Sequence, residues 1–265
     1  MAMITLRDGA KLSVETAGSG RPLVLISGLG GTGGFWAPLV EALGPILQTI
    51  CFDQRGVGGS ELGREPVSIR SLAEDTWEIV DALAGERPVL CGHSTGGAIV
   101  QEMELARPGA AAGLVLSGTW AGPDVFMERL FQTRLDVLTR LPEHYAMLSA
   151  LIGSPTRWLR DHPDALVQAA AQTPNETQAA VIAERIKALL AHDCRDRLAK
   201  AATPALVLGT EDDVIVPVYL QEELAALLSE AELHLFDKGG HFYPVTRPAD
   251  MATLLHDWLT KLDGR

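Results

Sequence analysis

Short apolar runs, most of them rich in β-branched residues, alternate along this chain with stretches of helical periodicity. Nearly continuous apolar runs are typical of strands that are buried on both faces of a parallel sheet. Near the N-terminus, residues 4–6 and 11–17 predict a β-hairpin that turns at Asp8 and Gly9. The later runs that predict strands are residues 23–27, 47–52, 88–92, 113–118, 204–209 and 232–236.

Between these runs, apolar residues recur every three or four positions, which predicts amphipathic helices. The clearest examples are residues 69–83 and 248–262. Their apolar stripes consist of Ile69, Leu72, Ile79, Val80 and Leu83 in the first and Met251, Leu254, Leu255, Trp258 and Leu262 in the second. Strands that alternate with helices favour an α/β fold, with an eight-stranded, mostly parallel sheet and helices on both faces.

One region interrupts this alternation. Residues 121–202 contain helical patterns with scattered aromatic residues and no clear strand, between two predicted strands. We therefore expect a core formed by residues 1–120 and 203–265, with residues 121–202 inserted as a helical cap over one end of the sheet.

The size and charge of the chain narrow its function. A length of 265 residues with 47% hydrophobic content fits one well-buried α/β domain. Lysine and arginine number 22 against 34 aspartate and glutamate residues, a net charge of −12. Such an acidic chain is a poor candidate for binding nucleic acid or an anionic membrane. We expect a small-molecule substrate, no nucleic-acid or membrane partner, and a monomer or homodimer.

We expect a chain without a secretion signal or a membrane span. No apolar run approaches the roughly 20 residues of a membrane span, and the first residues alternate like a strand and lack the apolar core of a signal peptide. The three cysteines, Cys51, Cys91 and Cys194, cannot all pair with one another, and the first two lie inside apolar runs. These features predict a reduced, cytoplasmic protein.

The stretch LCGHSTGGAIV at 90–100 places Ser94 between a predicted buried strand and a predicted helix. A tight strand-to-helix turn forces its middle residue into strained backbone angles and projects that side chain from the end of the sheet. Gly92 and Gly96 would leave room where side chains would clash. The helix N-terminus favours developing negative charge at this point. Ser94 is therefore a candidate nucleophile, and the alternative is a serine that only caps the helix.

Four segments in sequence order resemble those of α/β-hydrolase fold proteins. GHSTGG at 92–97 resembles the nucleophile elbow of that family, FDQRGVGGS at 52–60 its loop after the fourth strand, SGLGG at 27–31 its loop after the third strand, and KGGHFYPVTRP at 238–248 its catalytic histidine loop. The resemblance covers the whole chain. Within the family, the chain is most similar to small catabolic hydrolases, the 3-oxoadipate enol-lactonases and the aminoacrylate hydrolases of pyrimidine breakdown.

A serine nucleophile needs a general base, and histidine has a suitable pKa. Of the seven histidines, His241 stands in a glycine-rich loop directly after the last predicted strand. That loop belongs to the sheet edge where Ser94 is expected. His93 neighbours the serine, but an elbow points adjacent side chains in different directions, so we expect a structural role for it.

The imidazole in turn needs a carboxylate, and the loop after the seventh strand offers Glu211, Asp212 and Asp213. The resemblance gives two answers because this loop is one residue longer than the commonest form. Counting forward from Gly209 selects Asp212, and counting back from Pro217 selects Asp213. The enol-lactonase-like spacing favours Asp212, with Asp213 as the alternative.

The resemblance also implies an oxyanion hole, and the aromatic residues near the candidate site suggest a small, mostly apolar pocket. The oxyanion donors would be the backbone N–H groups of Leu29 and Thr95. Ser27 stands where the family usually has histidine, which leaves open how the loop is braced. Gly30, Trp120 and Phe242 are the candidate pocket residues.

Other polar motifs predict structural roles. Asp53 and Arg55 are expected to hold a glycine-rich turn by hydrogen bonds. The glycines at 28–34 lack the spacing and the lysine of nucleotide loops, and no histidine or cysteine cluster has the spacing of a metal site. We expect no cofactor and no metal.

These features predict a serine hydrolase that cleaves a small ester, lactone, enol-lactone or carbamate-like compound through an acyl-enzyme. The alternatives are a cofactor-free haloperoxidase or perhydrolase with a similar triad, and a ligand receptor that retains a slow triad. A scaffold without catalysis is disfavoured because serine, histidine and acid are all present.

Overall fold

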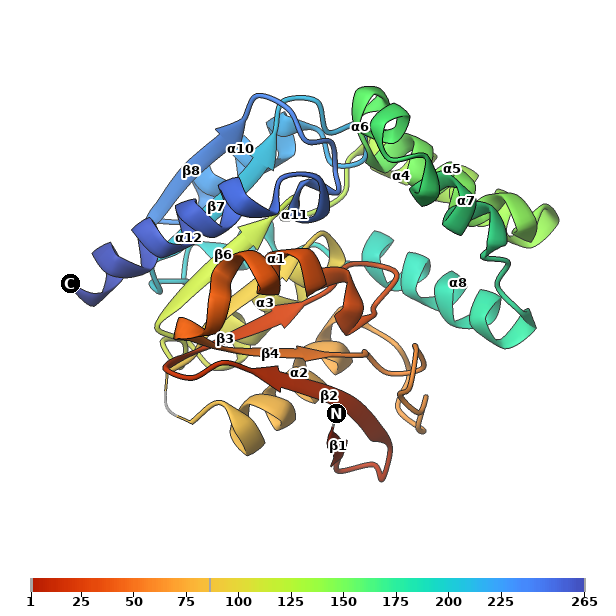
Figure 1. Ribbon diagram of the computed structural model, residues 1–265. Helices are drawn as coiled ribbons and strands as arrows, with labels where there is room; N and C mark the ends of the chain where they lie inside the picture. Colours follow the sequence, from red (N-terminus) through yellow and green to blue (C-terminus); the bar gives the residue numbers. More distant parts are fainter. Residues whose placement is uncertain (1, 86, 265) are drawn as a thin grey trace.

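The chain folds around an eight-stranded sheet with the strand order β1-β2-β4-β3-β5-β6-β7-β8 (Figure 1). The computed structural model describes residues 2–85 and 87–264. β2 is antiparallel to β1 and to β4, and all other neighbouring strands are parallel. The strands are β1 (Ala2–Thr5), β2 (Lys11–Ala17), β3 (Arg21–Ile26), β4 (Leu47–Phe52), β5 (Val89–His93), β6 (Gly113–Ser117), β7 (Ala205–Thr210) and β8 (Ala231–Phe236). The predicted mostly parallel sheet is confirmed.

Helices connect these strands in the predicted alternation. They are α1 (Ala37–Leu43), α2 (Ile69–Leu83), α3 (Thr95–Ala106), α4 (Val125–Arg140), α5 (Tyr145–Gly153), α6 (Thr156–Asp161), α7 (Pro163–Ala171), α8 (Glu176–Leu190), α9 (Arg195–Leu198), α10 (Val218–Leu227), α11 (Tyr243–Thr246) and α12 (Pro248–Asp263). The described residues also form the short 3-10 helices η1 (Gly33–Trp36), η2 (Gly44–Ile46) and η3 (Pro142–His144).

Consecutive residues of the central strands are hydrophobic because helices cover both faces of the sheet. In β3, Val24 and Ile26 pack in the cluster beneath α2 and α3. Leu23 and Leu25 alternate with them and pack in the cluster beneath α1 and α12. Figure 1 shows these two helix layers on opposite sides of the sheet. Successive residues of a strand point to opposite faces, so a strand between two layers must be apolar throughout.

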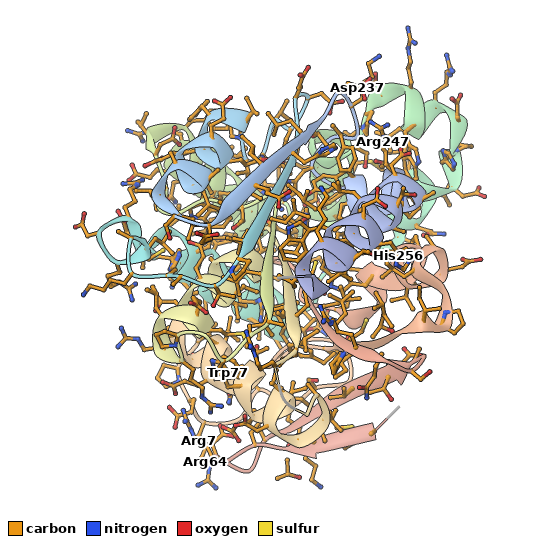
Figure 2. All side chains as sticks on the ribbon, turned by 90° about the vertical axis from the view of Figure 1, so that its left-hand side faces the viewer. Arg7, Arg64, Trp77, Asp237, Arg247 and His256 are labelled. Atoms are coloured by element: carbon orange, nitrogen blue, oxygen red, sulfur yellow. The ribbon has the colours of Figure 1, made fainter. Side chains whose placement is uncertain are left out.

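Helix α2 begins where the sequence pattern begins. Ser68 Oγ accepts a hydrogen bond from the Ser71 backbone N–H at 3.0 Å, and Ser71 Oγ accepts from the Ser68 N–H at 2.9 Å. This reciprocal pair satisfies two donors that a helix start leaves free. On the buried face of α2, Trp77 (labelled in Figure 2) donates from its indole to the Met103 carbonyl of α3 at 3.1 Å.

Residues 121–202 contain helices α4 to α9 and no strand. Figure 1 shows α4 to α8 at one side of the sheet. A third apolar cluster joins α4, α5 and α8 to Trp120 and to Ile215 in the loop after β7. The helical content agrees with the sequence, while the division of the chain into core and cap stays a prediction. Among the described residues, no helix combines the length and apolar character needed to cross a bilayer.

Candidate active site

Ser94 stands on a strained turn between β5 and α3. Its backbone has φ 55° and ψ −121°, a conformation that costs free energy for a residue with a Cβ atom and persists only where the surroundings enforce it. A Cβ atom on Gly92 would lie 2.1 Å from the Gly96 carbonyl oxygen, and one on Gly96 would lie 2.0 Å from the Ile26 carbonyl oxygen. Both glycines are therefore needed for close backbone approach, as the sequence predicted.

The turn leaves the Ser94 side chain free of a capping role. Ser94 precedes the first residue of α3, yet its hydroxyl makes no capping hydrogen bond. Its backbone N–H donates to the Ser117 carbonyl at 2.8 Å, which fixes the turn against the end of β6. The interpretation of Ser94 as only a helix cap is therefore wrong. Its hydroxyl lies at a helix N-terminus, where negative charge is stabilised.

His241 and Asp213 form a buried pair at the same edge of the sheet. Nδ1 of His241 lies 2.8 Å from Oδ2 of Asp213, and their side chains are 4% and 0% exposed. The second carboxylate oxygen of Asp213 accepts from the backbone N–H groups of Ile215 and Val216 at 2.8 and 2.9 Å. The carboxylate thus has a donor on each oxygen, which fixes its orientation toward the imidazole.

The preference for Asp212 as the partner of His241 is wrong, and the alternative, Asp213, takes that position. Beyond β7, the Asp213 N–H donates to the Thr210 carbonyl at 3.3 Å, and the chain turns so that Asp213 is buried and Asp212 is exposed. Asp212 instead accepts a hydrogen bond from the Gly240 N–H at 2.8 Å. Its role in the structure is to hold the loop that carries His241.

Several further contacts hold the loop of His241 in place. The Thr210 hydroxyl donates to the Gly240 carbonyl at 3.0 Å. Arg247 donates to Asp237 at 2.6 Å and to the Lys238 carbonyl at 2.8 Å, and Figure 2 shows Asp237 and Arg247 together beyond β8. The imidazole is therefore presented by a loop that is anchored at both of its ends.

His93 packs against the imidazole ring of His241. Its ring centroid lies 4.8 Å from that of His241 and 5.2 Å from that of Phe35. Its Nδ1 lies 2.9 Å from the Ser117 hydroxyl. Burial, and to a smaller extent the neighbouring His241, hold the pKa of His93 well below its usual value. A neutral, packed ring agrees with the structural role expected for it.

The two oxyanion candidates come from adjacent segments. Leu29 follows β3 and Thr95 begins α3, and neither backbone N–H donates in the loop and turn hydrogen bonds among the described residues. The loop of Leu29 lies against the serine, because a Cβ atom on Gly28 would be 3.1 Å from Ser94 Cβ. Both N–H groups are thus placed on segments that border Ser94.

Ser27, in place of the histidine usual at this position, does brace that loop. Its hydroxyl donates to the Thr32 carbonyl at 2.6 Å, and its own carbonyl accepts from Gln54 Nε2 at 2.6 Å. A third brace, Arg185 of α8, donates to the Leu29 carbonyl at 3.1 Å. The sequence analysis missed Arg185, because an arginine on a predicted helix is ordinarily solvated and nothing in the pattern marked this one as buried.

The candidate pocket residues differ in their surroundings. Trp120 is fully buried in the third apolar cluster, and its indole Nε1 has no hydrogen-bond partner among the described residues. The Phe242 ring is half-buried, with its centroid 5.7 Å from that of His241. Gly30 is exposed, and apart from its chain neighbours no heavy atom lies within 4 Å of the position where its Cβ would be. Their contact with substrate stays a prediction.

Asp53 and Arg55 have the structural roles that the sequence predicted. Asp53 accepts hydrogen bonds from the backbone N–H groups of Gly33 and Gly59 at 2.8 and 2.9 Å. Arg55 binds Asp75 of α2 through two nitrogens, at 2.8 and 2.7 Å, and Asp8 at 2.6 Å. The partners of Arg55 are thus more distant in sequence than the local turn suggested.

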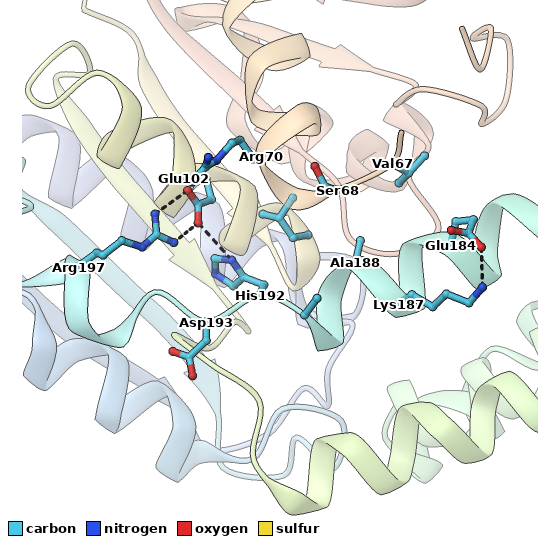
Figure 3. Close-up of a pocket in the computed structure, with 12 residues that line it drawn as sticks. Val67, Ser68, Arg70, Glu102, Glu184, Lys187, Ala188, His192, Asp193 and Arg197 are labelled. Atoms are coloured by element: carbon cyan, nitrogen blue, oxygen red, sulfur yellow. Dashed lines mark hydrogen bonds and ion pairs between the residues drawn. The ribbon is translucent and has the colours of Figure 1, made fainter. Parts of the chain in front are cut away.

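A cavity of about 410 Å³ lies elsewhere, between α2, α3, α8 and the segment before α9. Figure 3 shows Glu102 of α3 between Arg197 and His192, and the pair of Glu184 with Lys187. None of the catalytic candidates lines this cavity. The carboxylates that line it are paired with basic side chains of the protein, so we do not assign the chemistry to it. No group of three or more histidine, cysteine or acidic side chains in the described part of the chain is arranged to hold a metal ion.

Comparison with known proteins places this site in context. A family model described as alpha/beta hydrolase fold matches residues 21–248. A protein of Azorhizobium caulinodans, provisionally named carbamate hydrolase RutD, is 33% identical over 256 residues, which cover 96% of this chain and 97% of that protein.

Solved structures show the same fold. The enol-lactonase from Burkholderia xenovorans LB400 superposes with a TM-score of 0.87 at 23% identity, covering 98% of this chain and 100% of that one. Est816, described as an N-acyl homoserine lactone degrading enzyme, has a TM-score of 0.84 at 25% identity, with 96% and 98% of the two chains covered.

Proposed function

The chain belongs to the alpha/beta hydrolase fold family, and from this membership we propose that it is a hydrolase that cleaves a small carboxylic ester, lactone or carbamate through a covalent intermediate on Ser94. The resemblance that its sequence motifs indicated is thereby confirmed at the level of the family. The family match and the hydrolase relative support an enzyme of the hydrolase class.

One observation carries the proposal for Ser94. Its hydroxyl is held at φ 55° with no capping bond, at the sheet edge that also presents the buried pair of His241 and Asp213. A strained backbone conformation at a polar residue whose side chain makes no stabilising hydrogen bond is a recurrent feature of catalytic sites. A serine nucleophile, a histidine base and a carboxylate that orients it form a unit recognised by geometry and role.

In the proposed reaction, the Ser94 oxygen attacks the carbonyl carbon of the substrate while His241 Nε2 takes the hydroxyl proton. The carbonyl oxygen becomes an oxyanion, which accepts hydrogen bonds from the Leu29 and Thr95 N–H groups. Asp213 holds Nδ1–H of His241, so that Nε2 is the basic nitrogen, and it stabilises the imidazolium that forms.

The intermediate then collapses and the bond to the leaving group breaks. His241 gives its proton to the leaving alcohol or amine. In the second half of the cycle a water molecule transfers a proton to His241 and attacks the carbonyl carbon, and the bond to Ser94 breaks as the serine oxygen regains a proton. With a lactone, the leaving alkoxide stays attached to the acyl group, so one product is released.

The relatives support the substrate class. A carbamate, an enol-lactone and an N-acyl homoserine lactone all present a carbonyl carbon bonded to an oxygen or nitrogen leaving group. Each can be attacked by serine and give the same kind of oxyanion. The unpartnered indole N–H of Trp120 supports a polar contact with a substrate in surroundings that are otherwise apolar. We further propose that the protein acts without a macromolecular partner, as a monomer or homodimer in the cytoplasm, and uses no cofactor.

A substrate panel tests this proposal. Purified protein is assayed with p-nitrophenyl acetate, γ-butyrolactone, an N-acyl homoserine lactone and an aryl carbamate, and with monochlorodimedone, bromide and peroxide in acetate buffer. Multiple turnover of at least one carbonyl substrate, with little halogenation, is the expected result. Halogenation as the dominant activity would favour the perhydrolase alternative, and a single turnover followed by arrest would favour a receptor.

A further inference from the structure

Arg185 is a buried cation that reaches from α8 into the loops beside the candidate active site. Its side chain is wholly buried. Nε donates to the Leu29 carbonyl at 3.1 Å, one terminal nitrogen donates to the Arg55 carbonyl at 3.5 Å, and the other donates to the amide oxygen of Gln54. A single side chain of the inserted helices therefore contacts both the loop after β3 and the loop after β4.

No carboxylate forms an ion pair with Arg185 in the described part of the chain. The negative charge of Asp75 favours its charged form without direct contact. Burial lowers the pKa of Arg185 to about 10, which still leaves it charged at neutral pH. Burying a charge without a paired counter-charge costs several kcal/mol unless hydrogen bonds compensate. An apolar side chain would fill the same space without this cost, so packing alone does not explain an arginine here.

The guanidinium nitrogens of Arg185 make their contacts within the protein. All three of its guanidinium nitrogens have protein acceptors, and none is left without a partner among the described residues. Its acceptors are neutral oxygens of the protein backbone and of one amide. The fork of the guanidinium is therefore used within the protein, to fix the relative positions of separate segments.

The contacts of Arg185 converge on the backbone around Leu29. Gln54, which Arg185 binds, donates from its own side chain to the Ser27 carbonyl at 2.6 Å, and its N–H donates to the Gly31 carbonyl at 2.9 Å. A Cβ atom on Gly31 would lie 3.1 Å from an Arg185 nitrogen. The segment on both sides of Leu29 is thus held directly or through Gln54 by one guanidinium.

We propose that Arg185 is a positioning residue that sets the orientation of the Leu29 N–H toward the oxyanion, and that it couples helix α8 to the oxyanion hole. The inference rests on the proposed function, in which Leu29 and Thr95 donate to the oxyanion. A donor acts on a transition state only when it is aimed in advance at the place where charge develops. The Arg185 fork supplies this alignment from outside the loop.

The test compares Arg185→Lys and Arg185→Met with Lys187→Met, an exposed position on the same helix. We expect kcat for p-nitrophenyl acetate to fall about 10- to 100-fold in Arg185→Met, with KM changed by less than about threefold. Arg185→Lys keeps the charge and loses the fork, so its kcat should be intermediate. Lys187→Met should behave as the wild type.

A second readout separates positioning from general damage. A trifluoromethyl ketone adds to a serine and forms a tetrahedral oxyanion, whereas the carboxylate product forms none. The variants should bind the ketone more weakly by the same factor as kcat falls, and bind the product with unchanged affinity. Equal losses for both ligands, or a wild-type kcat in Arg185→Lys, would overturn the inference.

Gln54→Met provides an independent variant if Arg185→Met does not fold. It removes the amide that links Arg185 to Ser27, and a selective loss of ketone affinity is again expected, while unchanged affinity counts against the inference.

Different results would contradict the proposed function and the positioning role of Arg185. A wild type without turnover would overturn the proposed function and this inference with it. An active wild type with unaffected Arg185 and Gln54 variants would overturn only the positioning role.

Discussion

His241 Nδ1 lies 2.8 Å from Asp213 Oδ2, in a position where the aspartate side chain is wholly buried and accepts two further backbone hydrogen bonds. The adjacent Asp212 is exposed and contacts the N–H of Gly240. Two neighbouring aspartates therefore have separate tasks, one toward the imidazole and one toward the loop that carries it.

Exchange of each aspartate for asparagine separates these tasks. Asp213→Asn should lower kcat/KM by about 10³- to 10⁴-fold, because the amide cannot hold His241 in the required tautomer or stabilise its cation. Asp212→Asn keeps an oxygen that can accept from Gly240, so its loss should stay within about fivefold, the equivalent of one weakened hydrogen bond. Steady-state kinetics of the two variants shows which aspartate orients His241. A larger loss in Asp212→Asn than in Asp213→Asn would reverse the assignment.

Trp120→Phe tests the indole that lacks a partner. The substitution keeps an aromatic ring and removes a buried N–H group that is unsatisfied among the described residues. Relief of that group offsets part of the packing that the smaller ring loses, so the melting temperature should fall by no more than a few degrees. If the N–H contacts the substrate, KM should rise several-fold, by the equivalent of about 1 kcal/mol. Trp158→Phe, in α6, is the matched control. An unchanged KM in Trp120→Phe would remove Trp120 from the substrate contacts.

His192 predicts a loss of stability in mild acid. Burial lowers the pKa of His192 to about 4 even though Glu102 lies nearby (Figure 3). The unfolded chain binds a proton near the ordinary histidine pKa of about 6.5, whereas the folded chain stays neutral. Stability from this group is therefore complete above about pH 6.5 and is lost as the pH falls toward 4, by up to about 3 kcal/mol.

Chemical denaturation of His192→Gln as a function of pH checks this prediction. The free energy of unfolding should fall less between pH 6.5 and 4 in the variant than in the wild type. His144→Gln, at an exposed position of η3, should follow the wild type. Parallel curves for His192→Gln and the wild type would show that His192 does not cause the acid sensitivity.

The hydrophobic pattern of the sequence predicted the fold because the central strands are buried on both faces of the sheet. Helix α2 covers the same residues, 69–83, that the periodicity predicted, and the glycines beside Ser94 anticipated a close approach that the backbone requires. The choice between Asp212 and Asp213 needed the turn that begins at Thr210, since a loop longer by one residue changes which side chain faces inward. Counting residues from Gly209 or from Pro217 does not reveal that turn.

The contacts of Arg185 could not be predicted from the sequence for a related reason. Its acceptors belong to Leu29, Gln54 and Arg55, more than a hundred residues earlier. Helical periodicity locates α8 but does not reveal that a charged residue on it faces the loops of the core. Only the packing of the inserted helices against those loops brings the guanidinium to the backbone of Leu29.

Covalent labelling of Ser94 tests the central claim most directly. Protein treated with a fluorophosphonate is analysed by peptide mass mapping while residual ester hydrolysis is followed, with Ser94→Ala as the control. The account predicts one phosphonyl group per chain, located on Ser94, with activity lost in proportion to labelling and no label in the variant. A fully labelled Ser94 with activity retained, or ester turnover that persists at the wild-type rate in a folded Ser94→Ala protein, would contradict it.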